Sequence, residues 1–427
     1  MSTTTRIAGL IAGRVHYAWV VTGLMFVVIL SIVGVRAAPA VLMVPLETAF
    51  GWSRDTVSAA ISLNILLFGL IGPFAAALIQ TIGLKRTILL SLSILCVTML
   101  LASVISSPWQ LFATWGLMVG VGCGAGTVGL ATAIANRWFV ERRGLAVGLL
   151  TASNASGQLV FLPLLATVVE HGGWRGVSLL LAAVMAALIP LVMIALPESP
   201  RAVGLGPYGA PLEQTPGARA GNPVLVAFGG LARGIRSLDF WLLFSSFAVC
   251  GFSTNGLVGT HLIAYCVDHG IPEVSAAGIL AAIGVFDLIG TTLSGWLTDR
   301  FNSRVLLFWY YGLRGLSLIA LPFTNFDVVS LSVFAVFYGL DWIATVPPTV
   351  RIANEAFGDK NGPLVFGWVV AGHQLGAACA AFFAGFMRSA EGNYLEAFMI
   401  AGATGIVAAM LSLMITRRPT QPVLAAA

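Results

Sequence analysis

Four charged side chains stand inside long apolar stretches of this 427-residue sequence: Arg36, Asp287, Arg314 and Asp341. Arg314, for example, lies near the middle of YYGLRGLSLIALPF. Insertion measurements put an arginine at the centre of a membrane helix at about 2.5 to 3.5 kcal/mol. A chain accepts that cost where another group compensates the charge, and such residues commonly mark the path of a substrate or a proton.

The composition indicates what surrounds these charges. The chain is 58% hydrophobic and 9% charged, with a mean hydropathy of +0.94, whereas a soluble domain carries about 25% charged residues. Apolar runs of roughly 20 residues, enough to cross about 30 Å of hydrocarbon, recur from end to end. The sequence therefore predicts an all-α integral membrane protein with twelve transmembrane helices. Their approximate ranges are 17–44, 57–80, 87–105, 109–135, 144–168, 176–196, 240–266, 275–298, 305–323, 328–350, 363–387 and 394–415.

The basic residues predict how these spans are oriented. Seventeen of the 22 lysines and arginines fall in the tails and the even-numbered connections, and three fall in the odd-numbered connections. The positive-inside rule then places both termini in the cytoplasm, so we expect a multi-pass protein of the inner (cytoplasmic) membrane of the cell. The net charge of +5 reflects this topology and does not indicate a nucleic-acid partner. The N-terminus does not resemble a removed signal peptide.

The spacing of the cysteines and the absence of catalytic motifs argue against a metal site, an enzyme and a sensor. The five cysteines lie in or beside apolar segments without metal-ligand spacing, so we expect packing roles, no metal and no cofactor. No motif pairs a nucleophile with a base, which argues against an enzyme. The short tails and the linker leave no soluble output domain for a sensor.

The sequence predicts two six-helix bundles, at 1–196 and 240–427. A cytoplasmic linker rich in Pro and Gly, at 197–239, joins them. Short matches support a duplication. VSAA begins both the second and the eighth span, IAN recurs near the ends of the fourth and tenth, and GQL in the fifth span corresponds to HQL in the eleventh. Repeats of this kind place a substrate site between the halves, near the bilayer midplane.

GWLTDRFNSR, at 295–304, resembles the G-x-x-x-D-R-x-G-R-[KR] loop of the major facilitator superfamily. The resemblance implies the major facilitator fold and a latch that bridges neighbouring helices in one gating state. The latch residues would be Asp299, Arg300 and Arg304, with Lys85 and Arg86 in the degraded first-half loop AALIQTIGLKR. Within the superfamily, PLETAFGWSRDTVSAAIS (45–62), NRWFVERRGLAVG (136–148) and Asp287 resemble the monocarboxylate transporters and oxalate/formate antiporters.

Three of the intramembrane charges share one depth. Counted from the cytoplasmic ends of their spans, Asp287, Arg314 and Asp341 lie 10 to 12 residues deep, about 15 to 18 Å at 1.5 Å per residue. We therefore interpret them as a charge network in which Arg314 is a counter-ion, with direct substrate contact as the alternative. One arginine facing two acids leaves one acid without a fixed partner, and such an acid tends to bind a proton. The family resemblance favours Asp287 as the proton carrier.

Arg36 is the predicted substrate anchor. The first half has no intramembrane acid to pair with it, and its span lines the cavity in the superfamily, close to a functional lysine of animal monocarboxylate transporters. A guanidinium is suited to bidentate capture of a carboxylate. In the alternatives, Arg36 extends to the membrane interface or pairs with an acid of the second half.

Two polar sets complete the candidate substrate site. Asn255 and His261 lie in the polar seventh span, and the other set comprises Asn154 and Gln158 in the fifth span with His373 and Gln374 in the eleventh. Both sets have hydrogen bonding between helices as their alternative role. Pro347 and Pro348 should break or bend the cytoplasmic end of the tenth span.

The leading hypothesis is a secondary transporter of small organic anions, most simply monocarboxylates, working by proton symport or anion exchange. We expect a monomer that has the lipid bilayer, the anion and protons as its partners. The alternative is a proton-coupled exporter of drugs or hydrophobic compounds, which does not need Arg36.

Overall fold

A computed structural model describes residues 15–127, 130–212 and 222–416, which are almost entirely helical. The helices up to the linker are α2 (Tyr17–Phe50), α3 (Arg54–Thr81), α4 (Leu84–Ala102), α5 (Pro108–Leu111), η1 (Phe112–Met118), α6 (Val119–Thr127), α7 (Leu130–Trp138) and α8 (Arg143–Ala195). The linker contains η2 (Pro200–Val203) and α9 (Pro223–Gly234). The remaining helices are α10 (Leu238–Gly251), η4 (Phe252–Val258), α11 (Gly259–Asp268), α12 (Glu273–Arg300), α13 (Ser303–Ala320), η5 (Leu321–Phe323), α14 (Val328–Asp341), α15 (Val346–Glu391) and α16 (Leu395–Met414).

Ten helices within the described residues are long and apolar enough to cross a membrane. One of them, α8, has 53 residues, which corresponds to about 80 Å and exceeds twice the thickness of the hydrocarbon layer. It is interrupted at Gly173 (φ 64°, ψ −176°), so it supplies both the fifth and the sixth predicted spans. The pieces from α5 to α7 occupy the position of the fourth.

Some predicted boundaries differ from the structure. α2 continues to Phe50, beyond the predicted end near residue 44. The tenth span is interrupted earlier than predicted: α14 ends at Asp341, and α15 begins at Val346, directly before the two prolines. α15 then continues through a bend at Gly358 (φ 78°, ψ 158°) into the eleventh span.

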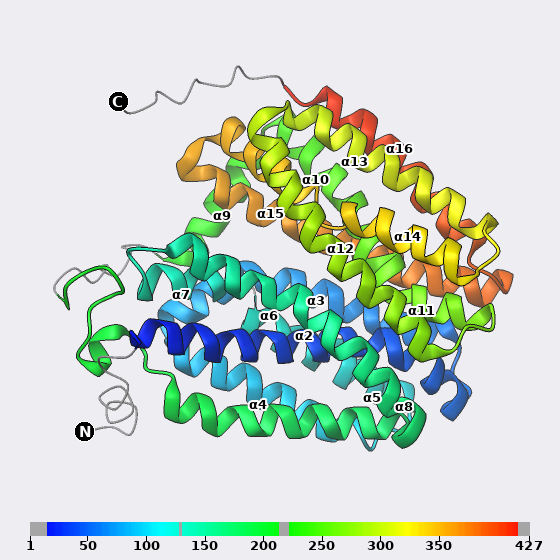
Figure 1. The fold of residues 1–427 in the computed structure, drawn as a ribbon, viewed down its shortest axis with the longest axis horizontal. Helices are drawn as coiled ribbons and strands as arrows, with labels where there is room; N and C mark the ends of the chain where they lie inside the picture. Colours follow the sequence, from blue (N-terminus) through cyan, green and yellow to red (C-terminus); the bar gives the residue numbers. More distant parts are fainter. Residues whose placement is uncertain (1–14, 128–129, 213–221, 417–427) are drawn as a thin grey trace.

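The helices form two groups, α2 to α8 below and α10 to α16 above in Figure 1. α3 packs along α15, and α8 packs along α12, so these two pairs form the seam between the groups. We call the end of the molecule where α2 begins and α16 finishes, on the left in Figure 1, the terminal end, and the opposite end the far end. The division into two repeats at 196 and 240 stays a prediction.

Glycines let the helices that carry the intramembrane charges approach closely. A Cβ atom on Gly290 of α12 would lie 1.9 Å from the Leu340 carbonyl oxygen of α14, so only glycine fits there. Likewise, a Cβ atom on Gly315 of α13 would lie 2.6 Å from the Gly402 carbonyl oxygen of α16. The charged residues of α12, α13 and α14 are therefore held among tightly packed backbones.

Candidate substrate site between the two halves

Two cavities meet at the seam, roughly midway along the helices. The small cavity, about 60 Å³, reaches toward the far end and is lined by residues such as Ile61 and Leu280. The large cavity, about 630 Å³, reaches toward the terminal end and is lined by residues such as Thr151 and Phe366. Six residues line both and are called the shared wall below: Val33, Arg36, Gln158, Asn255, Trp342 and Gln374. Four of the predicted substrate residues are among them.

Arg36 lies at the centre of the shared wall, on α2. Its guanidinium carbon stands 4.6 Å from the centroid of the Phe68 ring, a cation–π distance. Within the described residues, it forms no ion pair with a carboxylate. The alternatives of an interfacial position or a protein counter-ion therefore do not describe this conformation.

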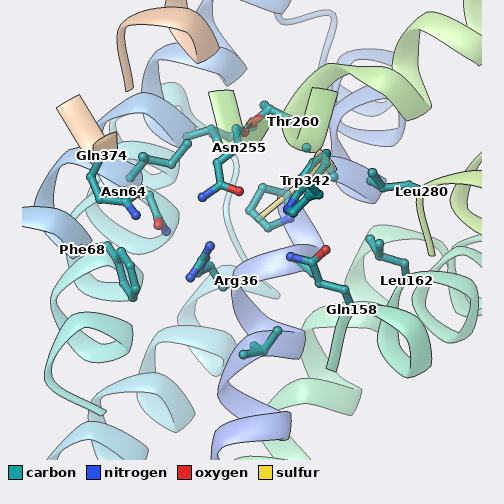
Figure 2. Close-up of a pocket in the computed structure, with 17 residues that line it drawn as sticks. Arg36, Asn64, Phe68, Gln158, Leu162, Asn255, Thr260, Leu280, Trp342 and Gln374 are labelled. Carbon is teal, nitrogen blue, oxygen red and sulfur yellow. Dashed lines mark hydrogen bonds between the residues drawn. The ribbon is translucent and has the colours of Figure 1, made fainter. Parts of the chain in front are cut away.

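Carboxamides surround this guanidinium. Figure 2 shows the side chains of Asn255 and Gln158 turned toward Arg36, with Gln374 on the opposite side of the small cavity. Asn255 lies on η4, a π-helical turn of the seventh span, and such turns are frequent at functional sites. A carboxamide supplies both donors and acceptors, so the shared wall combines one positive charge with neutral polar groups.

The large cavity adds two of the other predicted residues, Asp287 and His373. Asp287 Oδ1 accepts hydrogen bonds from the Thr291 hydroxyl and the Ile343 backbone N–H, both at 2.9 Å. Within the described residues, Asp287 has no ion-pair partner. The His373 ring packs against Phe247 with their centroids 4.9 Å apart.

Arg314 and Asp341 line neither cavity. Arg314 is 1% exposed, and its Nε lies 2.5 Å from Asp341 Oδ2. The same guanidinium donates to the Cys250 sulfur at 2.9 Å and to two backbone carbonyls of the tenth span. In this conformation, Asp341 has the fixed counter-charge, and Asp287 is the acid that faces the cavity.

His261 lies outside both cavities, toward the far end. Its Nε2 is 2.8 Å from the Ala381 carbonyl oxygen, which can only accept, so Nε2 carries the proton. Its Nδ1, 3.0 Å from the Tyr394 oxygen, then accepts from that hydroxyl. In this conformation, His261 therefore makes the interhelical hydrogen bonds that were the alternative to substrate binding. The side chain of Asn154 lies outside the described residues.

The far end joins the two halves through ionic groups. Arg54 of α3 pairs with Glu47 of α2 at 2.6 Å and with Asp268 of α11 at 3.1 Å, and it donates to the Tyr394 hydroxyl at 2.9 Å. Asp268 also accepts from Arg388 at 2.8 Å. We call these five residues, with His261, the far-end network. Burial raises the pKa of the Tyr394 hydroxyl above its usual range, which keeps the hydroxyl protonated and able to donate.

The predicted latch residues lie at the terminal end. Asp299 and Arg300 are exposed, and Arg300 stacks on Trp296 of its own helix at 4.0 Å. Arg304 donates to the Leu413 carbonyl oxygen, and Lys85 Nζ donates to the Met193 carbonyl oxygen at 2.6 Å. Within the described residues, no ion pair joins the halves at this end. The latch role of these residues and of Arg86 stays a prediction.

Several lining residues were not predicted, among them Asn64, Phe68 and Trp342. Asn64 could have been found from the sequence, because it is a polar amide within the apolar second span. Trp342 could also have been found, because it directly follows an intramembrane aspartate and precedes the two prolines. Phe68 resembles many other apolar residues and gave no signal. Within the described residues, no group of three or more His, Cys, Asp or Glu side chains is arranged to hold a metal.

Comparisons with known proteins agree with this architecture. The sequence profile of the Major Facilitator Superfamily matches residues 24–349. The uncharacterized MFS-type transporter YcxA of Bacillus subtilis (strain 168) is 26% identical over 389 residues, 88% of this chain and 90% of the relative. Monocarboxylate transporter 13 of Rattus norvegicus is 28% identical over 393 residues, 91% of this chain and 86% of the relative.

A solved structure is similar in fold. It is the crystal structure of a bacterial homolog of the human lysosomal transporter Spinster, in an inward-facing and occupied conformation. It matches with a TM-score of 0.76 at 15% identity and covers 94% of this chain and 97% of that one.

Proposed function

This chain belongs to the major facilitator superfamily of secondary transporters, and we propose that it moves small organic anions, most simply monocarboxylates, by proton symport or anion exchange. The observation that carries the proposal is the guanidinium of Arg36. It lies on the wall shared by both cavities, stands over the Phe68 ring, and has no carboxylate partner within the described residues. A cation in such a position is stabilised by an anionic ligand, and a carboxylate fits a guanidinium through two parallel hydrogen bonds.

The neighbouring groups favour a small anion. The small cavity of about 60 Å³ has room for a ligand of only a few heavy atoms beyond the shared wall. Asn255 and Gln158 offer further donors to oxygen atoms of the ligand. The similarity to monocarboxylate transporter 13 over most of both chains supports the same substrate class.

Asp287 is the proposed proton carrier. It faces the large cavity, and Arg314, the buried cation of the neighbouring span, is already paired with Asp341. A cavity-facing carboxylate without an ion pair exchanges protons more readily than one held by a guanidinium. Anion binding at Arg36 and proton binding at Asp287 would each remove a charge from the cavity, which lowers the cost of closing it.

For orientation, we propose the cytoplasmic membrane with both termini inside, as the basic residues predict. The large cavity then faces the cytoplasm, and the far-end network closes the outer side.

Uptake into liposomes by the purified protein tests the proposal. Labelled formate, oxalate, pyruvate and L-lactate are offered with an imposed pH gradient, or with the unlabelled anion inside and no gradient. Gradient-driven accumulation indicates symport, and exchange alone indicates antiport. Arg36→Ala should lower uptake of the transported anion by at least about tenfold. The lost charge-assisted contact contributes about 1.4 kcal/mol, which corresponds to a factor of ten. Unchanged uptake would instead favour the exporter of hydrophobic compounds.

A further inference from the structure

The seventh span contains a π-helical turn where it meets the cavities. This turn, η4 (Phe252–Val258), lies between the α-helices α10 and α11. The Gly259 N–H donates to the Thr254 carbonyl oxygen, five residues earlier, which is the hydrogen bond of a π-helix. Such a bond disturbs the regular pairing of the carbonyls beside it, and carbonyls inside a membrane need other donors.

Two side-chain hydroxyls donate to the carbonyls on either side of Thr254. Tyr338 of α14 donates to the Ser253 carbonyl oxygen at 2.8 Å. Thr260 of α11 donates to the Asn255 carbonyl oxygen, also at 2.8 Å. Both donors are buried. The π-turn is therefore supported by its own span and by the tenth span.

The reach of the Thr260 hydroxyl matches the widened turn. A threonine in an α-helix ordinarily donates to the carbonyl four residues earlier, as Thr254 does to Cys250 at 2.7 Å. Thr260 donates instead to the carbonyl five residues earlier. This hydrogen bond is therefore specific to the π-turn.

The π-turn also determines which residues share the cavity wall. Residues five apart lie about 140° apart around the axis of an α-helix, but they come nearly into line where the hydrogen bond spans five residues. Asn255 and Thr260 are five apart, and both line the small cavity. Figure 2 shows Thr260 beside Asn255, whose side chain is turned toward Arg36. The π-turn thus places the carboxamide next to the guanidinium.

α15 limits the space around the turn. A Cβ atom on Gly256 would lie 2.4 Å from the Ala377 carbonyl oxygen of α15. The backbone beside Asn255 therefore has no room to move toward α15. Together with Thr260 of α11 and Tyr338 of α14, this contact means that three helices determine where Asn255 stands.

We propose that Thr260 and Tyr338 are positioning residues that support the π-turn and thereby aim the Asn255 carboxamide at an anion bound to Arg36. The support of the turn stands on the structure alone, and the aiming rests on the proposed function. A threonine hydroxyl has one proton to donate, and that of Thr260 goes to the Asn255 carbonyl oxygen. Thr260 therefore lines the cavity but acts on the anion through Asn255, whose amide group donates to the anion.

Hydrogen–deuterium exchange tests the support of the turn without any ligand. The peptide that contains Asn255–Gly259 is followed by mass spectrometry in purified protein in lipid nanodiscs. Thr260→Val keeps the shape of the side chain but removes the hydroxyl, so it should accelerate exchange of this peptide about fivefold. Tyr338→Phe should have a similar effect. Thr260→Ser keeps the hydroxyl and should stay within about twofold of the wild type.

Thr98→Val is the matched control. Thr98 is also a buried threonine, and its hydroxyl donates to the Ile94 carbonyl oxygen at 2.6 Å within α4. The bond spans four residues, as in an ordinary α-helix, so its loss should leave exchange of the π-turn unchanged. A wild-type exchange rate in Thr260→Val or in Tyr338→Phe would overturn the supporting role of that residue.

A double-mutant cycle tests the aiming of Asn255. Equilibrium dialysis measures the affinity for whichever of formate, oxalate, pyruvate and L-lactate binds most tightly. We expect Asn255→Ala to weaken binding about tenfold and Thr260→Val about fivefold. The double variant should bind no more weakly than Asn255→Ala alone, because Thr260 acts through Asn255. Thr260→Ser and the control Thr98→Val should keep the wild-type affinity.

Two results would overturn the aiming. One is a loss of about fiftyfold in the double variant, the product of the single losses, which would show that Thr260 acts independently of Asn255. The other is wild-type affinity in Thr260→Val. If none of the four anions binds to the wild type, the proposed function fails and the aiming fails with it, whereas the exchange rates still decide the support of the π-turn.

Discussion

The two ends of the molecule hold the halves together by different means. At the far end, the guanidinium of Arg54, 8% exposed, reaches across the seam to Asp268 and Tyr394. At the terminal end, the halves are connected by contacts between aromatic side chains. Phe228 of α9 contacts Phe74 of α3 and Trp368 of α15, with ring centroids 5.9 and 5.8 Å apart.

This difference shows that the far end of the molecule is the closed end in this conformation. Partly buried charges that satisfy one another give a specific, well-defined contact, and no residue of the far-end network lines the small cavity. The terminal end has the large cavity, while the charges of GWLTDRFNSR at its rim are exposed or bonded within their own half. To change conformation, the transporter must break the far-end network and form new contacts at the terminal end. Four substitutions test this difference between the two ends, and one pair of spin labels reports the effect of each.

The reporters are spin labels at Ser106→Cys and Asn393→Cys, in far-end loops of the two halves. The five natural cysteines are replaced by alanine. Double electron–electron resonance gives the distance distribution between the labels and hence the fraction of molecules open at the far end.

Arg54→Ala should have the largest effect. It removes the cation that holds Glu47 and Asp268 and leaves two carboxylates facing each other across the seam. Losing one partner of a buried pair costs about 3 to 5 kcal/mol, and we expect roughly half of that here because both acids are partly exposed. The ratio of open to closed far ends should rise at least tenfold. An unchanged distance distribution would contradict the gating role of the network.

Gly385→Ala should open the far end by a somewhat smaller factor, about five- to tenfold. Its new Cβ atom would lie 2.1 Å from the Ser58 hydroxyl oxygen and 3.1 Å from the Arg54 carbonyl oxygen, so α15 and α3 must separate. Overpacking of this kind costs about 1 to 3 kcal/mol. Gly367→Ala is the control on the same helix, since nothing lies within 4 Å of its added atom. Equal label distances in the two variants would show that the close approach of α3 and α15 does not matter for closure.

Tyr394→Phe should open the far end about fivefold. It removes one hydroxyl that accepts from Arg54 and donates to His261, and a hydrogen bond contributes about 1 kcal/mol. Because burial raises the pKa of Tyr394 above its usual value, this hydroxyl is protonated in both the closed and the open state below about pH 9. The wild-type distance distribution should therefore not change between about pH 7 and pH 9 through this residue. A strong alkaline opening that Tyr394→Phe abolishes would contradict this assignment.

Asp299→Asn should have the smallest effect and the opposite sign. If Asp299 belongs to a latch that forms when the terminal end closes, its loss destabilises that other conformation and favours closure of the far end. Exposed ion pairs contribute about 0.2 to 1 kcal/mol, so the open fraction should fall less than fivefold. A rise in the open fraction would argue against the latch.

The sequence predicted the family and the helical membrane fold, for physical reasons. Charges inside apolar runs are rare and therefore informative, and Arg36 was selected because its half contains no intramembrane acid. The structure places Arg36 on the shared wall together with Asn255, Gln158 and Gln374. The substrate roles of these residues remain predictions.

What the sequence left open depends on contacts between distant residues. The polarity of the seventh span identified both Asn255 and His261. It did not predict that Asn255 lines the cavities whereas His261 contacts Tyr394. Arg314 was recognised as a charge in need of a partner. Its carbonyl partners depend on a helix break in another span, and the sequence pattern placed that break at the cytoplasmic end rather than at Trp342.

Equilibrium dialysis of purified protein with labelled formate, oxalate, pyruvate and L-lactate measures directly whether Arg36 anchors an anion. The account predicts saturable binding of at least one of them to the wild type, weakened at least about tenfold in Arg36→Gln. It also predicts wild-type binding in the control Arg175→Gln, an exposed arginine that stacks on Trp174 at 4.2 Å. The same affinity in Arg36→Gln and the wild type would contradict the account.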